Sequence, residues 1–282
     1  MLVTVTGYPG QLASEFKSKT QNDDRWIFLS INDLDITNEK KVFTYFNQNK
    51  TDYIINCAAY TNVDRAESEH ESAFSVNCNA VKNLLEACKL NNIKLIHFST
   101  DYVFNGKSKK AYDENDSTNP KGIYGMSKKE GEDYIINSNV KSLIIRTSWL
   151  YSNFGNNFVK TIIKISDKNE INIVQDQVGS PTYASDLADL TIKIINSNNY
   201  KWVFGEVFHF CNDGSCSWFE FANEIFKVLN INTKINPVSS IDFNSKVDRP
   251  KYSVLNNYKI KKTFDIEIND WKKSLYIMLS KL

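Results

Sequence analysis

The sequence predicts an α/β protein built on a doubly wound parallel sheet, with a smaller domain interleaved at its C-terminal end. Three observations support this fold class. Strand-like apolar runs alternate with helix-like ones along the first half of the chain. The first apolar run, residues 2–6, leads directly into a turn with two glycines and then a helical segment. The fourth run ends abruptly in the hydroxyl-rich stretch STDY.

Short apolar runs and helical stripes define the elements of the first half in order. The segment 76–90 illustrates a helical stripe, because its apolar residues fall at positions 76, 80, 84, 85 and 88. The expected strands cover residues 2–6, 26–30, 53–57, 95–99 and 143–146. The expected helices between them cover residues 12–19, 40–47, 76–90 and 124–136.

The alternation loosens after Trp149. Helices are expected over residues 158–165, 185–195 and 218–229, and strands over 171–174 and 207–210. We therefore divide the chain into a first domain over 1–148 and an interleaved second domain over 149–282. The stretch of about 185–212 is expected to return to the first domain.

Composition excludes several classes of function. The 34 basic and 33 acidic residues nearly cancel, so the chain has no basic surface for nucleic acid. No apolar run approaches the roughly 20 residues that a membrane-spanning helix needs. The N-terminus has no signal-peptide pattern, and the five cysteines lack metal-site spacing. We expect a cytoplasmic protein with free thiols, no membrane association and no bound metal.

The glycine turn follows the first strand as G-x-x-G-x-x-A. Gly7 permits a sharp turn, and Gly10 allows the backbone to approach a phosphate. The following helix offers free N–H groups to a pyrophosphate, although an ordinary βα turn is the alternative. No carboxylate occupies Ser30, at the end of the second strand, so nothing there repels a 2′-phosphate. This favours NADPH over NADH, with Asp33 and Asp35 only slightly later in the chain.

The third and fourth strands end in residues suited to a ligand site. Ala58 and Ala59 are small enough for a flat ligand to lie close, or they simply pack against a helix. Tyr124 and Lys128 are four apart and share one face of a helix. An ammonium near the phenol is expected to lower its pKa and make it a usable proton donor to a carbonyl oxygen. Thr100, at the sheet edge, is placed to hydrogen-bond the same oxygen.

Together these motifs resemble a known family. The stretches GYPGQLASEF, AAYTNVDRAESE, STDYVFNG, YGMSK, RTSWLY and DQVGSPTYASDLA are similar to the extended short-chain dehydrogenase/reductase superfamily. Within it they most resemble the dTDP-4-dehydrorhamnose reductase family, over roughly residues 1–190. The resemblance implies an NAD(P)H-binding Rossmann domain followed by a substrate-binding domain. It also implies reduction of the 4-keto group of a nucleotide-linked 6-deoxysugar, with NADPH as cofactor and NADH possible.

The resemblance also implies a role for each site residue. Tyr124 would be the proton donor, and Lys128 would bind the nicotinamide ribose and tune Tyr124. Thr100 would hold the keto oxygen, and Asn77 would support the lysine through water. The residues implied to bind the cofactor are Gly7, Gly10, Gln11, Leu12, Asp35, Ile36, Ala58, Ala59 and Tyr60. Those implied to line the sugar pocket are Val63, Tyr102 and Trp149, with Gln177 and Pro181 on a neighbouring loop.

The sequence differs from the family pattern at some positions, and these differences narrow the expected function and oligomeric state. Related sugar-nucleotide dehydratases carry a glutamate where this chain has Tyr102, which disfavours dehydration. Glu15 matches an acidic position that some members use in a magnesium-linked dimer, but Ser185 occupies the partner position. A monomer or a homodimer without metal is therefore expected. Reduction of a different nucleotide sugar for a surface glycan, and a regulatory dinucleotide-binding subunit, are alternative functions.

Three residues of the second domain have open roles. Trp218, Arg249 and Trp271 either touch substrate or fill a small core. Arg249 is either an anchor for a diphosphate or a partner in a surface salt bridge.

Overall fold

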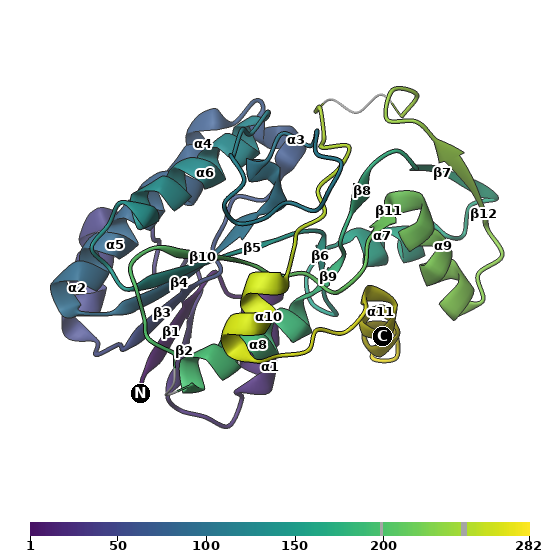
Figure 1. Cartoon of the computed structure of the whole chain (residues 1–282). Coiled ribbons are helices and arrows are strands. Elements are labelled where there is room, and N and C mark those ends of the chain that lie inside the picture. The colour runs from purple at the N-terminus through teal and green to yellow at the C-terminus, as the bar shows by residue number, and fades with distance from the viewer. Residues whose placement is uncertain (198–199, 244–246) are drawn as a thin grey trace.

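A six-stranded sheet forms the centre of the protein (Figure 1), in a computed structural model that describes residues 1–197, 200–243 and 247–282. Its strands are β1 (Val3–Thr6), β2 (Trp26–Leu29), β3 (Tyr53–Asn56), β4 (Lys94–Thr100), β5 (Ser142–Thr147) and β10 (Glu206–His209). The strand order is β10-β5-β4-β3-β1-β2, and all neighbours run parallel. The winding reverses between β1 and β3, where such sheets bind ligands. The predicted doubly wound parallel sheet is confirmed.

Helices cover both faces of the sheet because its central strands are apolar on both sides. Ile54 and Ile144 face the layer formed by α2 (Glu39–Gln48), α5 (Ala80–Asn91) and α6 (Ile123–Ile136). The next residues, Ile55 and Ile145, face the opposite layer of α1 (Gln11–Lys19), α8 (Ala184–Asn196) and α10 (Tyr258–Phe264). The two layers lie on opposite sides of the strands in Figure 1. The alternation follows from the two-residue period of a strand.

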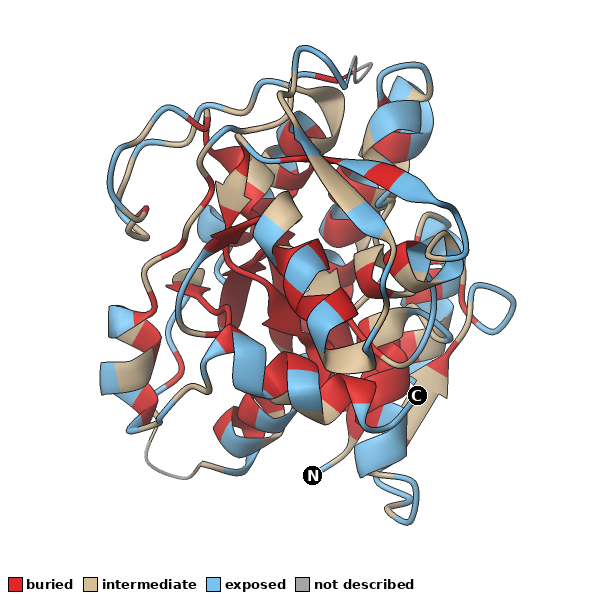
Figure 2. Cartoon of the chain, turned by 90° about the vertical axis from the view of Figure 1, so that its right-hand side faces the viewer, coloured by how far each residue is buried: buried red, intermediate tan, exposed pale blue. Residues whose placement is uncertain are grey.

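A second apolar core lies beside the C-terminal ends of the strands. Its helices are α7 (Phe158–Lys164), α9 (Trp218–Leu229) and α11 (Trp271–Leu279). Three short strand pairs surround them: β7 (Glu170–Val174) with β12 (Lys234–Val238), β8 (Val178–Gly179) with β11 (Cys216–Ser217), and β6 (Leu150–Tyr151) with β9 (Thr182–Tyr183). Figure 2 shows that buried residues concentrate in the sheet and on the inward helix faces.

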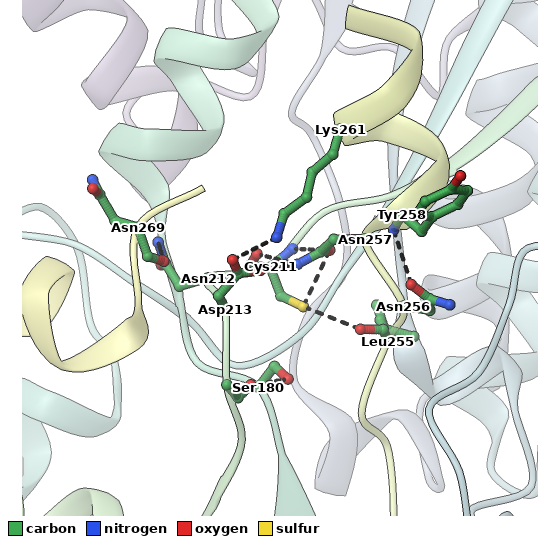
Figure 3. A network of polar contacts seen from close by, with 11 residues as sticks. Ser180, Cys211, Asn212, Asp213, Leu255, Asn256, Asn257, Tyr258, Lys261 and Asn269 are labelled. Atoms are coloured by element: carbon green, nitrogen blue, oxygen red, sulfur yellow. Dashed lines mark hydrogen bonds and ion pairs between the residues drawn. The ribbon is translucent and has the colours of Figure 1, made fainter. Parts of the chain in front are cut away.

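Polar side chains hold together the segments that cross between the two cores (Figure 3). Asn257 donates from Nδ2 to the carbonyl of Cys211 at 2.8 Å and accepts from its N–H at 3.1 Å. Asp213, two residues further along, pairs with Lys261 on α10. These contacts fix the segment that leaves β10 against the segment that enters α10.

Most predicted elements agree with the structure to within two residues, but several regions differ. The helix expected over 76–90 begins earlier, as α4 (His70–Phe74), and continues through a π-helical turn, η1 (Ser75–Asn79), into α5. Short helices α3 (Val63–Ala66) and η2 (Asp101–Val103) were not predicted, nor were α10, α11 and β12. The division into domains 1–148 and 149–282 stays a prediction. Within the described part of the chain, no helix combines the length and apolar character needed to span a membrane.

Candidate active site

A cleft of about 850 Å³ opens at the C-terminal ends of β1, β3 and β4. Its wall includes residues from the loops after these strands, from the start of α6 and from the second core. The sequence-predicted residues in the wall are Gly7, Gly10, Gln11, Leu12, Asp35, Ile36, Ala58, Ala59, Tyr60, Val63, Thr100, Tyr102, Tyr124, Lys128 and Trp149. The other three predicted site residues, Asn77, Gln177 and Pro181, are not part of the wall.

The glycine turn forms one end of the cleft. Gly7 has a φ of 82°, and a Cβ there would lie 2.5 Å from the backbone nitrogen of Ala58. A Cβ on Gly10 would lie 2.7 Å from the carbonyl oxygen of Gly7. A side chain at either position would therefore clash with neighbouring backbone atoms. The free N–H groups at the start of α1, where Gln11 and Leu12 face the cleft, suit a pyrophosphate.

The loop after β2 folds back, so that the Asp33 carboxylate contacts Ser30. Asp33 Oδ2 accepts hydrogen bonds from the backbone nitrogen of Ser30 at 2.9 Å and from its Oγ at 2.6 Å. A carboxylate therefore does contact Ser30, although neither Ser30 nor Asp33 is part of the cleft wall. Asp35 is engaged with Thr37 at 2.7 Å, and Ile36 is buried beside it.

Asn77 lies behind the cleft wall, in the π-helical turn η1. Its Oδ1 accepts from the Tyr60 backbone nitrogen at 2.9 Å, and its Nδ2 donates to the Tyr60 carbonyl at 3.0 Å. The same Nδ2 donates to Ser127 Oγ at 3.0 Å, one residue from Lys128. Asn77 thus joins the loop after β3 to helix α6. π-helical turns of this kind often mark functional sites.

Lys128 is almost completely enclosed, with 2 % of its surface exposed. Its Nζ donates to the carbonyl oxygen of Phe98 at 2.6 Å and lies 3.1 Å from His97 Nε2. Burial lowers the pKa of Lys128 to about 8, and the Glu132 carboxylate opposes this shift. Lys128 is therefore poised to exchange its proton near neutral pH.

Tyr124 faces the same cleft, and its pKa moves in the opposite direction from our expectation. Burial raises the pKa of Tyr124 to about 12, and its hydrogen bond with the Thr100 side chain only partly counters this. The expectation that Lys128 lowers this pKa is wrong for this structure, since the lysine protons point to Phe98 and His97. A phenol with this pKa is protonated at neutral pH, as a proton donor must be.

Thr100 occupies the last position of β4, between two polar groups. Its Oγ1 donates to Asp101 Oδ1 at 3.0 Å and accepts from the Tyr102 backbone nitrogen at 3.2 Å. Asp101 is buried, which raises its pKa to about 6. Thr100 and Tyr124 both form part of the cleft wall, so two hydroxyl side chains line the same cleft.

Buried polar side chains on β1, β3 and β4 form a chain of contacts that ends at Lys128. Asn56 Oδ1 accepts from Thr6 Oγ1 at 2.7 Å and from the Ala58 backbone nitrogen at 3.2 Å. This orientation turns Asn56 Nδ2 toward His97 Nδ1, at 3.1 Å. The other ring nitrogen of His97, Nε2, lies 3.1 Å from Lys128 Nζ. Burial, reinforced by Lys128, lowers the pKa of His97 well below its usual value, so the imidazole is neutral.

A buried ion pair between Glu132 and Arg146 lies near Lys128. Glu132, one turn along α6, receives bonds from Arg146 Nε at 2.8 Å and from Nη2 at 2.7 Å. Both side chains are buried. The bidentate geometry satisfies both charges, and it leaves Glu132 close enough to influence the lysine.

The far end of the cleft is aromatic. Trp149 has a φ of 47°, unusual for a residue with a side chain, and its indole stacks on Trp218 at a centroid distance of 3.4 Å. A Cβ on Gly179 would lie 2.5 Å from this indole, so only glycine leaves room for it. Tyr102 lies edge-on to Tyr124 with ring centroids 5.5 Å apart.

The neighbouring loop does not bring its predicted residues into the cleft wall. Gln177 is buried and donates to Ser240 Oγ at 3.0 Å. Pro181 is buried, and its carbonyl accepts from the backbone nitrogen of Asn212 at 3.2 Å. Arg249 forms a salt bridge with Asp64 at 2.9 Å, the second of the two roles considered for it.

Sequence reasoning assigned no role to several residues of the wall. Asn157 donates from Nδ2 to Gln11 Oε1 at 3.0 Å, which links the loop before α7 to the glycine turn. Gly155 has a φ of 61° and packs directly on the Gln11 side chain. Trp218, for which the sequence left two roles open, is part of the wall at its aromatic end. The glycine and the two asparagines at 155–157 were a visible loop signal, but their contact with α1 depends on the fold.

The Glu15 side chain makes a hydrogen bond within the protein. It is buried and accepts a hydrogen bond from Ser152 Oγ at 2.6 Å. Ser185, at the partner position, is also buried. Among the described residues no group of three or more His, Cys, Asp or Glu side chains is arranged to hold a metal ion.

The sheet topology, the glycine turn and the Thr–Tyr–Lys set define a Rossmann-type oxidoreductase of the extended short-chain dehydrogenase/reductase class. The family model described as "RmlD substrate binding domain" matches residues 1–282, and the chain belongs to this family.

Individual relatives match over nearly the whole chain. The dTDP-4-dehydrorhamnose reductase of Aggregatibacter actinomycetemcomitans is 38% identical, covering 96% of each chain. A spore coat polysaccharide biosynthesis protein of Bacillus subtilis is also 38% identical, covering 97% of this chain and 95% of its own. The crystal structure of the Bacillus anthracis dTDP-4-dehydrorhamnose reductase in complex with NADP is 37% identical, with a TM-score of 0.94 and full coverage of both chains.

Proposed function

We propose that this protein uses NAD(P)H to reduce the 4-keto group of a nucleotide-linked 6-deoxysugar. The observation that carries the proposal is one cleft that contains both the glycine turn and the Thr100, Tyr124 and Lys128 side chains. The first suits a dinucleotide and the second suits a carbonyl group. Family membership supports the same reaction class.

The cofactor end of the cleft fits a nicotinamide dinucleotide. The turn at Gly7 and Gly10 has no space for a Cβ, which suits close approach of a pyrophosphate to the backbone. The relative from Bacillus anthracis that binds NADP supports NADPH as the cofactor, with NADH as an alternative. When bound, the reduced nicotinamide supplies the hydride that is added to the carbonyl carbon.

Three side chains of this chain would act on the carbonyl oxygen. Tyr124 donates the proton that converts the oxyanion to an alcohol, because its phenol is protonated at neutral pH. Thr100 hydrogen-bonds the same oxygen and fixes its position. Lys128 holds the ribose and replaces the proton on Tyr124, a role suited to a pKa of about 8. Asn77 positions the α6 segment that carries both residues.

The proposed substrate is dTDP-4-dehydro-L-rhamnose, which would be reduced to dTDP-L-rhamnose. Val63, Tyr102 and Trp149 would contact the sugar. Burial and the nearby Asp101 raise the pKa of Tyr102, so its hydroxyl stays protonated and is not the base that a dehydratase needs. The spore coat relative supports the competing possibility of a different nucleotide sugar for a surface glycan.

The test is to mix the purified protein with NADPH and dTDP-4-dehydro-L-rhamnose and to follow the loss of reduced-cofactor absorbance. We expect Tyr124→Phe to lower kcat by roughly 10²–10⁴-fold, the usual contribution of a general acid. Tyr134→Phe is the matched control, because Tyr134 lies on the same helix with its ring partly exposed. The product is identified by NMR of the sugar.

The outcomes separate the alternatives. Turnover of another nucleotide 4-ketosugar, but not of the rhamnose precursor, would retain the chemistry and reject the substrate. Binding of NADPH without turnover of any ketosugar would favour a regulatory dinucleotide-binding subunit. Full activity of the Tyr124→Phe variant would refute the assignment of the proton donor.

A further inference from the structure

Thr100 has one hydroxyl proton, and a neighbouring carboxylate competes for it. An ionised carboxylate only accepts hydrogen bonds, so the 3.0 Å contact between Thr100 Oγ1 and Asp101 Oδ1 uses the proton of the threonine. The backbone N–H of Tyr102 occupies one lone pair of the same hydroxyl, at 3.2 Å. While Asp101 is ionised, Thr100 therefore has no proton left to donate into the cleft.

The Asp101 side chain lies where an ionised carboxylate is poorly stabilised. Asp101 belongs to the cleft wall, yet only 2 % of its surface is exposed. Its second carboxylate oxygen, Oδ2, is buried and has no hydrogen-bond partner among the residues that the structure describes. Burial raises the pKa of Asp101 to about 6, and the Ser253 and Thr100 side chains only partly oppose this shift. The neutral acid avoids the cost of an unpartnered buried charge.

Protonation of Asp101 reverses the direction of its hydrogen bond with Thr100. A threonine hydroxyl accepts two hydrogen bonds and donates one. With the acid proton on Oδ1, the two acceptor sites of Thr100 are filled by Asp101 and by the Tyr102 backbone N–H. The hydroxyl proton of Thr100 is then free to point at a carbonyl oxygen in the cleft. A neutral Asp101 also places no negative charge near the oxygen on which charge develops during hydride addition.

The groups around Asp101 keep their charge while Asp101 titrates. Three titratable side chains respond to its charge: Tyr102 on η2, Tyr124 on α6 and Cys211 after β10. Burial raises the pKa of all three, to about 12 for Tyr124 and Cys211, so each is neutral below about pH 8. Arg249, whose charge acts on Tyr102, stays cationic throughout. Lys128, in the same wall, has a pKa of about 8, above that of Asp101.

We propose that Asp101 is a positioning residue for the reduction: as the neutral acid it donates to Thr100 and thereby turns the Thr100 hydroxyl toward the keto oxygen. The inference rests on the proposed function. The two residues at the end of β4 then work as a pair, in which Thr100 contacts the substrate and Asp101 acts only through Thr100. Activity depends on the charge of Asp101 and falls when its carboxyl group ionises.

The test is the pH dependence of kcat/KM for the ketosugar at saturating NADPH, from about pH 5.5 to about pH 8. In the wild type we expect kcat/KM to fall above about pH 6, approaching tenfold per pH unit, because only protein with a neutral Asp101 is productive. Asp101→Asn should lose this decrease, since an amide N–H donates to Thr100 at every pH. At about pH 8 its kcat/KM should exceed that of the wild type by about tenfold.

Two further variants separate positioning from support of the fold. Thr100→Val should lower kcat/KM by roughly 10²–10³-fold at low pH, the usual effect of removing one donor to a developing oxyanion. Asp113→Asn is the matched control, because Asp113 accepts from Asn256 Nδ2 at 2.7 Å in the loop after η2 and is not part of the cleft wall. It should keep the wild-type pH profile. A loss of activity in Asp101→Asn by the same factor at every pH would overturn the inference.

NMR of isotope-labelled aspartate carboxyl groups gives a readout that needs no substrate. The resonance that is missing from Asp101→Asn identifies Asp101, and in the wild type it should titrate near the pKa of about 6. Thr100→Val should raise this pKa, because it removes a hydrogen bond to the ionised form.

The two readouts separate this inference from the proposed function. A carboxyl group at residue 101 that titrates at the ordinary aspartate pKa of about 4 would overturn the inference, whether or not a ketosugar is reduced. If the NMR titrations are as expected but none of the proteins reduces a ketosugar, the proposed function is rejected and the pairing of Asp101 with Thr100 is supported.

Discussion

Replacing Lys128 with methionine should abolish activity but also remove a cost to folding. The shift of the Lys128 pKa from 10.5 to about 8 corresponds to roughly 3 kcal/mol of destabilisation at neutral pH. The methionine variant would also lose the hydrogen bonds to Phe98 and His97, and each loss would lower its stability by about 1 kcal/mol. The variant should therefore be about 1 kcal/mol more stable than the wild type at about pH 7.

The sign of this difference should reverse with pH. The unfolded chain binds the lysine proton more tightly than the folded protein does, so between about pH 8 and 10.5 the wild type gains stability as pH rises. By about pH 9.5 that gain is about 2 kcal/mol, and the methionine variant becomes the less stable protein. The other ionisable groups close to Lys128, which are His97, Glu132 and Cys57, are present in both proteins.

Urea denaturation followed by tryptophan fluorescence at both pH values measures the difference. The control is Lys129→Met, which removes a partly exposed lysine paired with Asp133 on the same helix. Its difference from the wild type should be the same at both pH values. A Lys128→Met variant that is less stable at neutral pH by an amount that does not depend on pH would refute the reasoning.

Three further predictions concern residues that lie behind or beside the cleft wall. Glu132→Gln leaves the buried Arg146 guanidinium without its charge partner and should cost about 3 kcal/mol in urea denaturation; an undiminished unfolding midpoint would show that the pair is dispensable. Gly179→Ala should push the Trp149 indole out of place and raise KM for the sugar at least severalfold, while cofactor affinity measured by calorimetry stays unchanged. Asn77→Ala removes three hydrogen bonds, one of them buried, and should lower the unfolding free energy by about 2 kcal/mol, with weaker cofactor binding as a second readout.

The sequence was a good guide to elements whose pattern is local. The strands through Ile54 and Ile144 and the helix that carries Tyr124 were predicted from apolar runs and helical spacing, and the structure has them at nearly the predicted positions. Helix α10 was missed because it buries only Ile260 and Phe264, too few apolar positions to stand out. The π-helical turn at Asn77 was also missed, since no sequence pattern distinguishes it from an α-helix.

In the candidate site, too, the sequence predicted the features that depend on neighbouring residues and missed those that depend on the fold. The sequence placed Tyr124 and Lys128 on one helix face and the glycine turn after the first strand, because helical spacing and backbone freedom depend on neighbouring residues. It gave the wrong direction for the Tyr124 pKa, which burial raises, and it did not predict that Asp33 contacts Ser30.

What the sequence determined by itself is the order of strands and helices and the chemistry at the end of each. What only the tertiary structure decided is that Asp33 turns back onto Ser30, that Lys128 is enclosed against His97, and that residue 179 is glycine beneath the Trp149 ring. Desolvation and packing contacts depend on segments that are distant in the chain, so no local pattern encodes them.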